Sequence, residues 1–135
     1  MIKKIEHIGI AVKNIETANA VYTKLLGTSA YKSENVESEG VITSFFKVGE
    51  SKIELLEGTS ANSPISKFID KKGEGMHHIA FEVDDIEKEM ENLRNQGFAL
   101  LSDKPKPGAD NKLICFVHPK SANGVLIELC QEIKK

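Results

Sequence analysis

Two histidines and two glutamates lie in stretches of the chain that are otherwise mostly apolar. His7 opens the stretch His-Ile-Gly-Ile-Ala-Val, and His78 opens the stretch His-Ile-Ala-Phe-Glu-Val. Glu54 and Glu128 each occupy the centre of an Ile-Glu-Leu triplet. Imidazole and carboxylate groups together suit Zn, Co, Ni, Mn or Fe, and four protein ligands leave open positions on an octahedral ion. We therefore predict that these four side chains bind one divalent metal ion.

An internal repeat relates the two histidines and the two glutamates. When the sequence is shifted by 71 positions, residues 7–16 fall on residues 78–87, and five of the ten positions are identical. Near the end of each half the shift grows to 74, which brings Glu54 onto Glu128 and predicts three extra residues in a loop of the second half. A single histidine or glutamate in a strand is usually solvent-facing or structural. Recurrence of both residue types at matching positions favours a joint metal site instead.

The elements that must position these residues follow the same repeat. We predict two βαβββ modules, residues 4–57 and 76–131, that form a single domain over residues 1–135. The fold class is α+β, a cupped mixed sheet with helices on its outer face. In the first module the expected strands are residues 5–12, 41–48 and 51–57, and a capped helix runs from Asn14 to Gly27. In the second module the expected strands are residues 78–83, 112–118 and 125–131, and a capped helix runs from Asp85 to Gly97.

Two further helix features are predicted. A short helix between the modules begins at Ser63-Pro64 and ends at Gly73. The apolar stripe of the first helix is expected to comprise the residues at helical spacing, Ile15, Ala18, Val21, Tyr22 and Leu25.

Strand alternation decides which side chains share a face. Alternate residues of a strand point to the same side, so His7 shares a face with Gly9. His77 falls on the face opposite His78, and we assign the second of the two adjacent histidines as the ligand. The helices are expected to cover the aliphatic face, which leaves the histidines and glutamates on a roomier concave face.

Composition narrows the class of protein. The chain has 135 residues, with 18 Lys+Arg against 20 Asp+Glu and a formal net charge of −2, which excludes a strongly basic nucleic-acid binder and gives no sign of a membrane-surface protein. No apolar run approaches the roughly 18 residues of a membrane span, and no signal-peptide core is present. Cys115 and Cys130 do not make a disulfide framework. We expect a cytoplasmic protein.

Three stretches resemble the vicinal-oxygen-chelate superfamily, which includes glyoxalase I, extradiol dioxygenases and methylmalonyl-CoA epimerase. They are residues 77–86, the Pro107-Gly108-Ala109 loop, and residues 118–129 from His118-Pro119-Lys120 to the final Ile-Glu-Leu. The resemblance covers essentially the whole chain and is closest to the methylmalonyl-CoA epimerase group. It implies paired βαβββ modules around a metal, with His7, Glu54, His78 and Glu128 as its ligands.

The resemblance implies a metal-dependent isomerase that interconverts (R)- and (S)-methylmalonyl-CoA. A proton is removed at C2, and a divalent metal, Co, Zn, Ni or Mn, stabilises the enolate. Glu128 is expected to be the base and Glu54 its counterpart on the other face. A homodimer is expected, because homodimers are common in the resembling family.

Two alternative functions follow from the same residues. Some epimerases have glutamine at position 54 whereas glyoxalase I enzymes have glutamate as here, and residues 37–40 depart from the epimerase pattern. A lactoylglutathione lyase acting on a thiol adduct, the methylglyoxal–glutathione hemithioacetal, is therefore the second hypothesis. A non-enzymatic small-molecule-binding module is the third, and retention of all four ligands argues against it.

An acyl-CoA substrate carries phosphates, so a basic rim is expected, and the candidates lie on predicted loops of the second module: Lys104, Lys106, Lys112 and Lys120. Cys130 shares strand parity with Glu128 and either lines the cavity or is a small buried residue. Cys115 is expected in the core.

Overall fold

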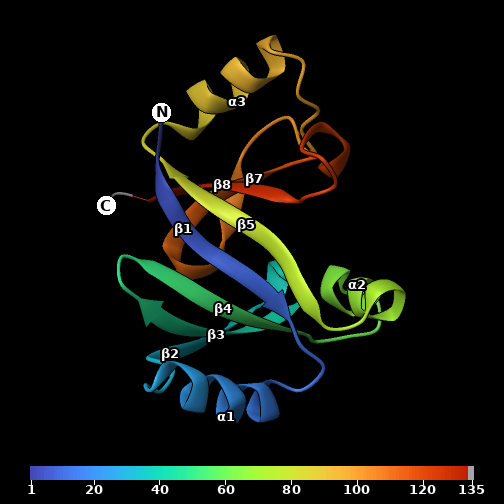
Figure 1. The fold of residues 1–135 in the computed structure, drawn as a ribbon. Coiled ribbons are helices and arrows are strands. Elements are labelled where there is room, and N and C mark those ends of the chain that lie inside the picture. Colours follow the sequence, from blue (N-terminus) through green and yellow to red (C-terminus); the bar gives the residue numbers. More distant parts are fainter. Residues whose placement is uncertain (134–135) are drawn as a thin grey trace. The chain divides into compact units, whose positions relative to one another are not determined.

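The computed structural model describes residues 1–133 of the chain (Figure 1). The chain forms two compact units. One unit comprises residues 7–77, and the other comprises residues 1–6 together with the chain from residue 78 onward. The expectation of a single domain over residues 1–135 stays a prediction. None of the helices in the described residues is long and apolar enough to cross a membrane.

The unit of residues 7–77 contains one β-α-β-β-β series followed by a helix. The bounds are β1 Ile2–Ala11, which enters this unit at residue 7, α1 Ile15–Leu26, β2 Lys32–Val36, the short 3-10 helix η1 Glu37–Glu39, β3 Val41–Val48, β4 Ser51–Gly58 and α2 Pro64–Lys72. The strand order is β2-β3-β4-β1, in which β1 pairs parallel with β4 and the other pairs are antiparallel.

The second unit repeats this plan. The bounds are β5 Gly75–Val83, which enters at residue 78, α3 Ile86–Asn95, β6 Lys106–Gly108, η2 Ala109–Asn111, β7 Lys112–Val117, η3 Pro119–Ser121 and β8 Ile127–Glu132. The strand order is β5-β8-β7-β6, with β5 parallel to β8 and the other pairs antiparallel. The two units thus have the same topology, which confirms the predicted α+β fold of paired βαβββ modules.

The helix caps form where the sequence predicts them. The Asn14 side chain accepts a hydrogen bond from the backbone N–H of Thr17, and α1 ends at Gly27 in the left-handed conformation (φ 72°) that glycine adopts without a steric cost. Asp85 caps α3 in the same way. Ser63 caps α2, which ends before Gly73 as predicted.

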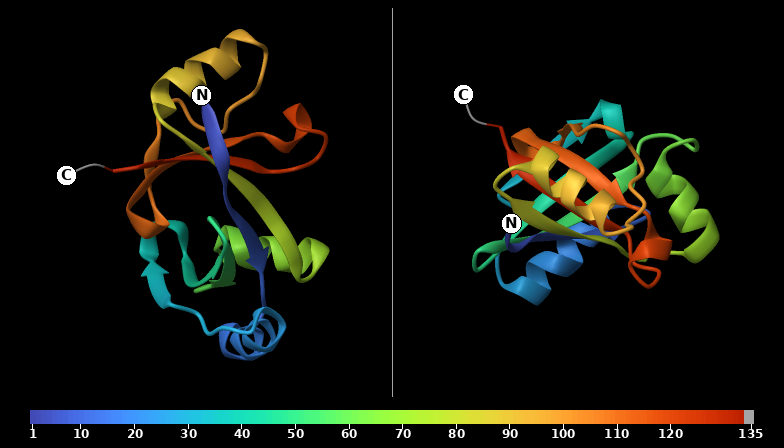
Figure 2. Two further views of the ribbon diagram at one scale, coloured as in Figure 1. Left: turned by 60° about the vertical axis from the view of Figure 1, so that its left-hand side comes forward. Right: turned by 90° about the horizontal axis from the view of Figure 1, so that it is seen from above.

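One helix covers one face of the strands in each unit (Figure 2). Beneath α1, the buried side chains of Val12, Phe46 and Leu55 form an apolar cluster. Between α3 and the strands of its unit, the corresponding cluster is larger and comprises Ile86 and Met90 of the helix with Val83, Cys115 and Leu129. These clusters occupy the aliphatic face of each set of strands, as alternation predicts.

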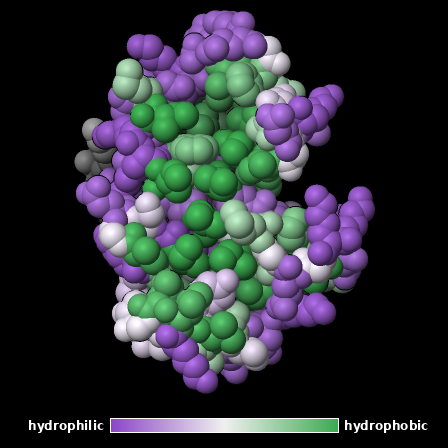
Figure 3. Space-filling view, viewed as in Figure 1, coloured by the Kyte–Doolittle hydropathy of each residue, from purple (hydrophilic) through white to green (hydrophobic). Residues whose placement is uncertain are grey.

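The predicted stripe of α1 is wrong at two positions. Val21 and Leu25 are 54% and 70% exposed, whereas Tyr22 and Leu26 pack against the cluster beneath the helix. With 3.6 residues per turn, the face that starts at Ile15 continues through residues 18, 22 and 26, and positions 21 and 25 rotate towards solvent. Hydrophobic side chains reach the surface in both units on the face shown in Figure 3, so this exposure is not peculiar to α1.

Candidate metal centre

The unit of residues 7–77 holds one buried histidine–glutamate pair. Gly9 on β1 lies opposite Glu54 on β4, and His7, two residues before Gly9, points to the same face. The Nδ1 atom of His7 lies 3.1 Å from the Oε2 atom of Glu54. Both residues are buried, at 5% and 4% exposure. The parallel pairing of the first and last strands of the module therefore brings together two side chains that are 47 positions apart in the sequence.

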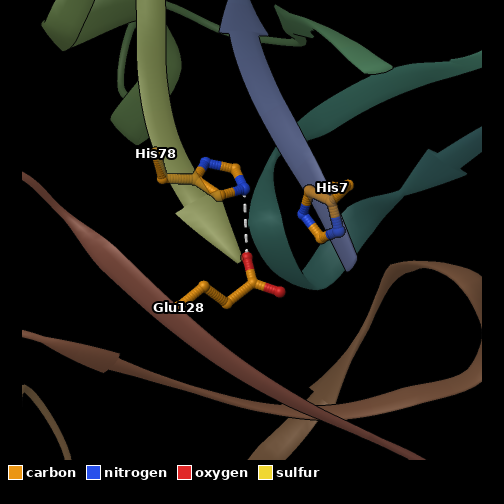
Figure 4. Close-up of side chains that lie close together, drawn as sticks. All are labelled: His7, His78 and Glu128. Atoms are coloured by element: carbon orange, nitrogen blue, oxygen red, sulfur yellow. Dashed lines mark ion pairs between the residues drawn. The ribbon is translucent and has the colours of Figure 1, made fainter. Parts of the chain in front are cut away.

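The second unit holds the matching pair. Ala80 on β5 lies opposite Glu128 on β8, and His78 shares the face of Ala80. The Nε2 atom of His78 lies 3.1 Å from the Oε1 atom of Glu128, and the two side chains point towards one another in Figure 4. His78 and Glu128 are 6% and 5% exposed.

A phenylalanine accompanies each pair at matching positions. Phe116 on β7 lies opposite Glu128, and its ring meets the His78 imidazole edge-on, with centroids 6.0 Å apart and an interplanar angle of 87°. Phe45 on β3 lies opposite Glu54 in the same register. Each unit thus presents a histidine, a glutamate and a phenylalanine on one face.

The donor set fits a divalent metal ion. All four side chains are among the buried groups of the described residues that could hold one. Imidazole and carboxylate donors, which each pair supplies, suit first-row metals such as Zn, Co, Ni or Mn. Burying a carboxylate is costly unless it is paired or coordinates a metal, and each glutamate here lies against an imidazole.

His77 lies on the other face of β5, as alternation predicts. Its ring meets the ring of Phe68, on α2, edge-on, with centroids 4.9 Å apart. The two histidine side chains thus lie on opposite faces of β5, and the assignment of His78 as a metal ligand stays a prediction.

One buried carboxylate is not among the predicted ligands. Glu6 directly precedes His7 and is only 2% exposed, and it is a further candidate metal ligand. Strict alternation places it on the face opposite His7, together with Ile8 and Ile10. The one available signal was its position next to a candidate ligand.

The prediction that Lys112 contributes to a basic rim is wrong, and of its two expected positions, a loop and the strand of residues 112–118, the structure confirms the strand. Lys112 is the first residue of β7 and is 5% exposed. Its Nζ atom lies 3.8 Å from Oδ2 of Asp110 and 3.9 Å from Oε1 of Glu132, so its charge is compensated within the unit. Lys104 and Lys120 are exposed on connections and Lys106 is exposed on the short strand β6. A role for these three lysines stays a prediction.

The two cysteines lie on opposite faces of the second unit. Cys130 is fully buried in an apolar cluster with Ala80, Ile114 and Phe116, on the face of Glu128. Cys115 lies in the cluster beneath α3, as expected, and burial raises the pKa of its thiol to about 11.

Comparison with known proteins gives consistent matches along the chain. A family model described as the Glyoxalase/Bleomycin resistance protein/Dioxygenase superfamily matches residues 6–116. The uncharacterized protein YqjC of Bacillus subtilis is 41% identical over 128 residues, which cover 95% of this chain and 91% of that protein. The ethylmalonyl-CoA/methylmalonyl-CoA epimerase of Cereibacter sphaeroides is 39% identical over 133 residues, which cover 97% and 99%.

A solved structure gives the same result for the fold. A variant of the Streptomyces coelicolor methylmalonyl-CoA epimerase, in complex with 2-nitronate-propionyl-CoA, matches with a TM-score of 0.95 and 34% sequence identity. The match covers 99% of this chain and 100% of that one. The glyoxalase-like fold implied by the resemblance is thereby confirmed over nearly the full length.

Proposed function

The chain belongs to the Glyoxalase/Bleomycin resistance protein/Dioxygenase superfamily, and from this premise we propose that it interconverts (R)- and (S)-methylmalonyl-CoA with the help of a divalent metal ion. The expectation of an isomerase is confirmed, because epimerases match nearly the whole chain in sequence and in fold. The observation that supports the proposal most is the buried histidine–glutamate pair found at the same place in each unit.

We assign the metal to His7, Glu54, His78 and Glu128 together. The repeat supports a joint site, because each unit supplies only two of the four ligands and neither pair alone offers the coordination typical of a protein metal site. A divalent ion held there would stabilise the negative charge that develops as C2 of the acyl group loses its proton. The metal is Co, Zn, Ni or Mn.

The two glutamates supply the proton chemistry. Glu128 removes the C2 proton from one face of the acyl group, and Glu54, from the other module, returns a proton to the opposite face. The bond to hydrogen at C2 breaks on one side and forms on the other, so the configuration inverts with no net change in composition. Because both carboxylates are buried, bulk water is kept from the reacting carbon.

Exchange of the C2 hydrogen with solvent deuterium tests this function. The metal-loaded protein is incubated in D₂O with methylmalonyl-CoA, and the C2 signal is followed by NMR with Zn, Co, Ni and Mn each tested. We expect the C2 signal to be lost with at least one of these metals. After chelation of the metal we expect the signal to persist. Glu128→Gln is expected to slow the exchange by at least about 100-fold, the usual contribution of a positioned base, in a comparison of variant and wild type at equal measured metal loading.

A parallel assay with the methylglyoxal–glutathione hemithioacetal separates the alternative. Formation of thioester absorbance with no exchange of methylmalonyl-CoA would make the protein a lactoylglutathione lyase. Absence of both reactions in fully metal-loaded protein would leave a binding module and would contradict the proposal.

A further inference from the structure

Thr43 carries a buried hydroxyl whose hydrogen-bonding capacity is unused in the structure. The residue lies on β3 and has 0% exposure. Within the described residues, no hydrogen-bond partner lies within reach of its Oγ1 atom. Since most buried polar side-chain atoms are hydrogen-bonded, such a group calls for an explanation, and an absent partner molecule is one.

The hydroxyl lies on the same face as the His7–Glu54 pair. Phe45 is directly opposite Glu54, and Thr43 is two residues from Phe45 on the same strand and opposite Leu56. Thr43 is therefore the diagonal neighbour of Glu54, a relation in which Cα atoms lie about 7–8 Å apart. The cluster beneath α1 is on the other side of the sheet and includes Phe46 and Leu55.

The matching position of the other unit is apolar. Ile114 on β7 lies two residues from Phe116, just as Thr43 lies two residues from Phe45, and it is opposite Cys130. Ile114 and Cys130 belong to an apolar cluster with Ala80. The histidine, glutamate and phenylalanine recur in both units, whereas the next position along the strand is polar in one and apolar in the other.

This difference suits the chemistry of an acyl group whose C2 carries unlike substituents. In methylmalonyl-CoA one substituent is a carboxylate, which accepts hydrogen bonds, and another is a methyl group, which does not. Threonine can donate one hydrogen bond, and a bond to an ionised acceptor is stronger than one to a neutral acceptor. Resting on the proposed function, we propose that the Thr43 hydroxyl donates a hydrogen bond to the free carboxylate of the acyl-CoA substrate and so determines specificity for malonyl-type thioesters.

Binding of two thioesters that differ only in the carboxylate tests this role. The metal-loaded protein is titrated calorimetrically with methylmalonyl-CoA and with propionyl-CoA. Thr43→Val is expected to raise the Kd for methylmalonyl-CoA about tenfold, equivalent to about 1.4 kcal/mol, and to leave the Kd for propionyl-CoA unchanged. Thr43→Ser keeps the hydroxyl and is expected to bind methylmalonyl-CoA as the wild type does.

Ser44 provides a matched control. Its hydroxyl is also buried and without a hydrogen-bond partner in the described residues, but it points to the opposite face of β3. Ser44→Ala is expected to change neither Kd. If Thr43→Val does not fold, the pair Thr43→Ala and Thr43→Ser gives the same comparison, because these variants differ by one hydroxyl.

The binding results distinguish failure of the role proposed for Thr43 from failure of the proposed function. Unchanged binding of methylmalonyl-CoA by Thr43→Val overturns the role of Thr43 and leaves the proposed function intact. Equal weakening of both thioesters also overturns it, because the loss is then independent of the carboxylate. A wild-type protein that binds neither thioester contradicts the proposed function and the role of Thr43 with it.

Discussion

The thiol of Cys115 is surrounded by apolar side chains beneath α3, and burial raises its pKa from an ordinary value of 9.0 to about 11. The folded state therefore holds the thiol proton more tightly than the unfolded chain does. The stabilisation from this group is complete below pH 9, and it is lost as the pH rises through 11.

Urea denaturation between pH 7.5 and 11 tests this shift. Cys115→Ala removes both the thiol and some packing, so the wild type is more stable at pH 7.5. We expect the difference in free energy of unfolding between wild type and variant to narrow as the pH passes from 9 to 11. A constant difference over that range would show that the thiol does not titrate differently in the folded protein.

Most of the candidate site follows from strand alternation alone. His7 and Glu54 meet because parallel neighbours in a sheet present matching faces, and His78 and Glu128 meet for the same reason. The burial of Lys112 could not be predicted in this way. It depends on Asp110, which turns back in the left-handed conformation (φ 59°), and on Glu132 from a neighbouring strand.

The start of each main helix is held by a side chain from the last strand of its module. The Oε1 atom of Glu57 accepts a hydrogen bond of 2.7 Å from the backbone N–H of Ile15, and Oε1 of Gln131 accepts one of 2.7 Å from the backbone N–H of Ile86. The first N–H groups of a helix have no partner within it. These bonds therefore tie α1 and α3 to the strands that carry Glu54 and Glu128.

Substitution of Glu57 or Gln131 measures how much these hydrogen bonds contribute to the stability of the protein. Glu57→Ala is expected to lower the free energy of unfolding by about 1 kcal/mol, the usual cost of losing a cap. Glu57→Gln introduces the residue that the other module has at this place, and this variant is expected to retain most of the stability that the hydrogen bond contributes. Chemical denaturation of both variants and of Gln131→Ala provides the comparison, and an unchanged stability of Glu57→Ala would mean that water replaces the bond.

Helix ends and long strands are predictable from sequence here, whereas short edge strands are not. Asn14, Gly27 and Asp85 act through local backbone chemistry that the sequence itself contains. The strands β2 and β6, at residues 32–36 and 106–108, are polar or contain proline and show no alternation. These two strands form because they pair with β3 and β7. Such pairing depends on the tertiary structure and cannot be predicted from the local sequence.

On the scale of the molecule, a repeated module supplies the same three site residues twice. The loop predicted to hold three extra residues is the connection between β7 and β8, which contains η3. Before this loop the repeat offset is 71, as for Phe45 and Phe116, and after it the offset is 74, as for Glu54 and Glu128. Duplication of the module explains how a chain of this size presents two buried histidine–glutamate pairs.

Counting bound metal tests the central claim that the two pairs form one site. Metal-free protein is saturated with Co²⁺, freed of excess ion, and analysed for cobalt per chain by mass spectrometry. We expect one ion per chain in the wild type, almost none in His7→Ala or in His78→Ala, and one in the control His77→Ala. Two ions per chain, with each variant at a site histidine losing only one of them, would contradict the account.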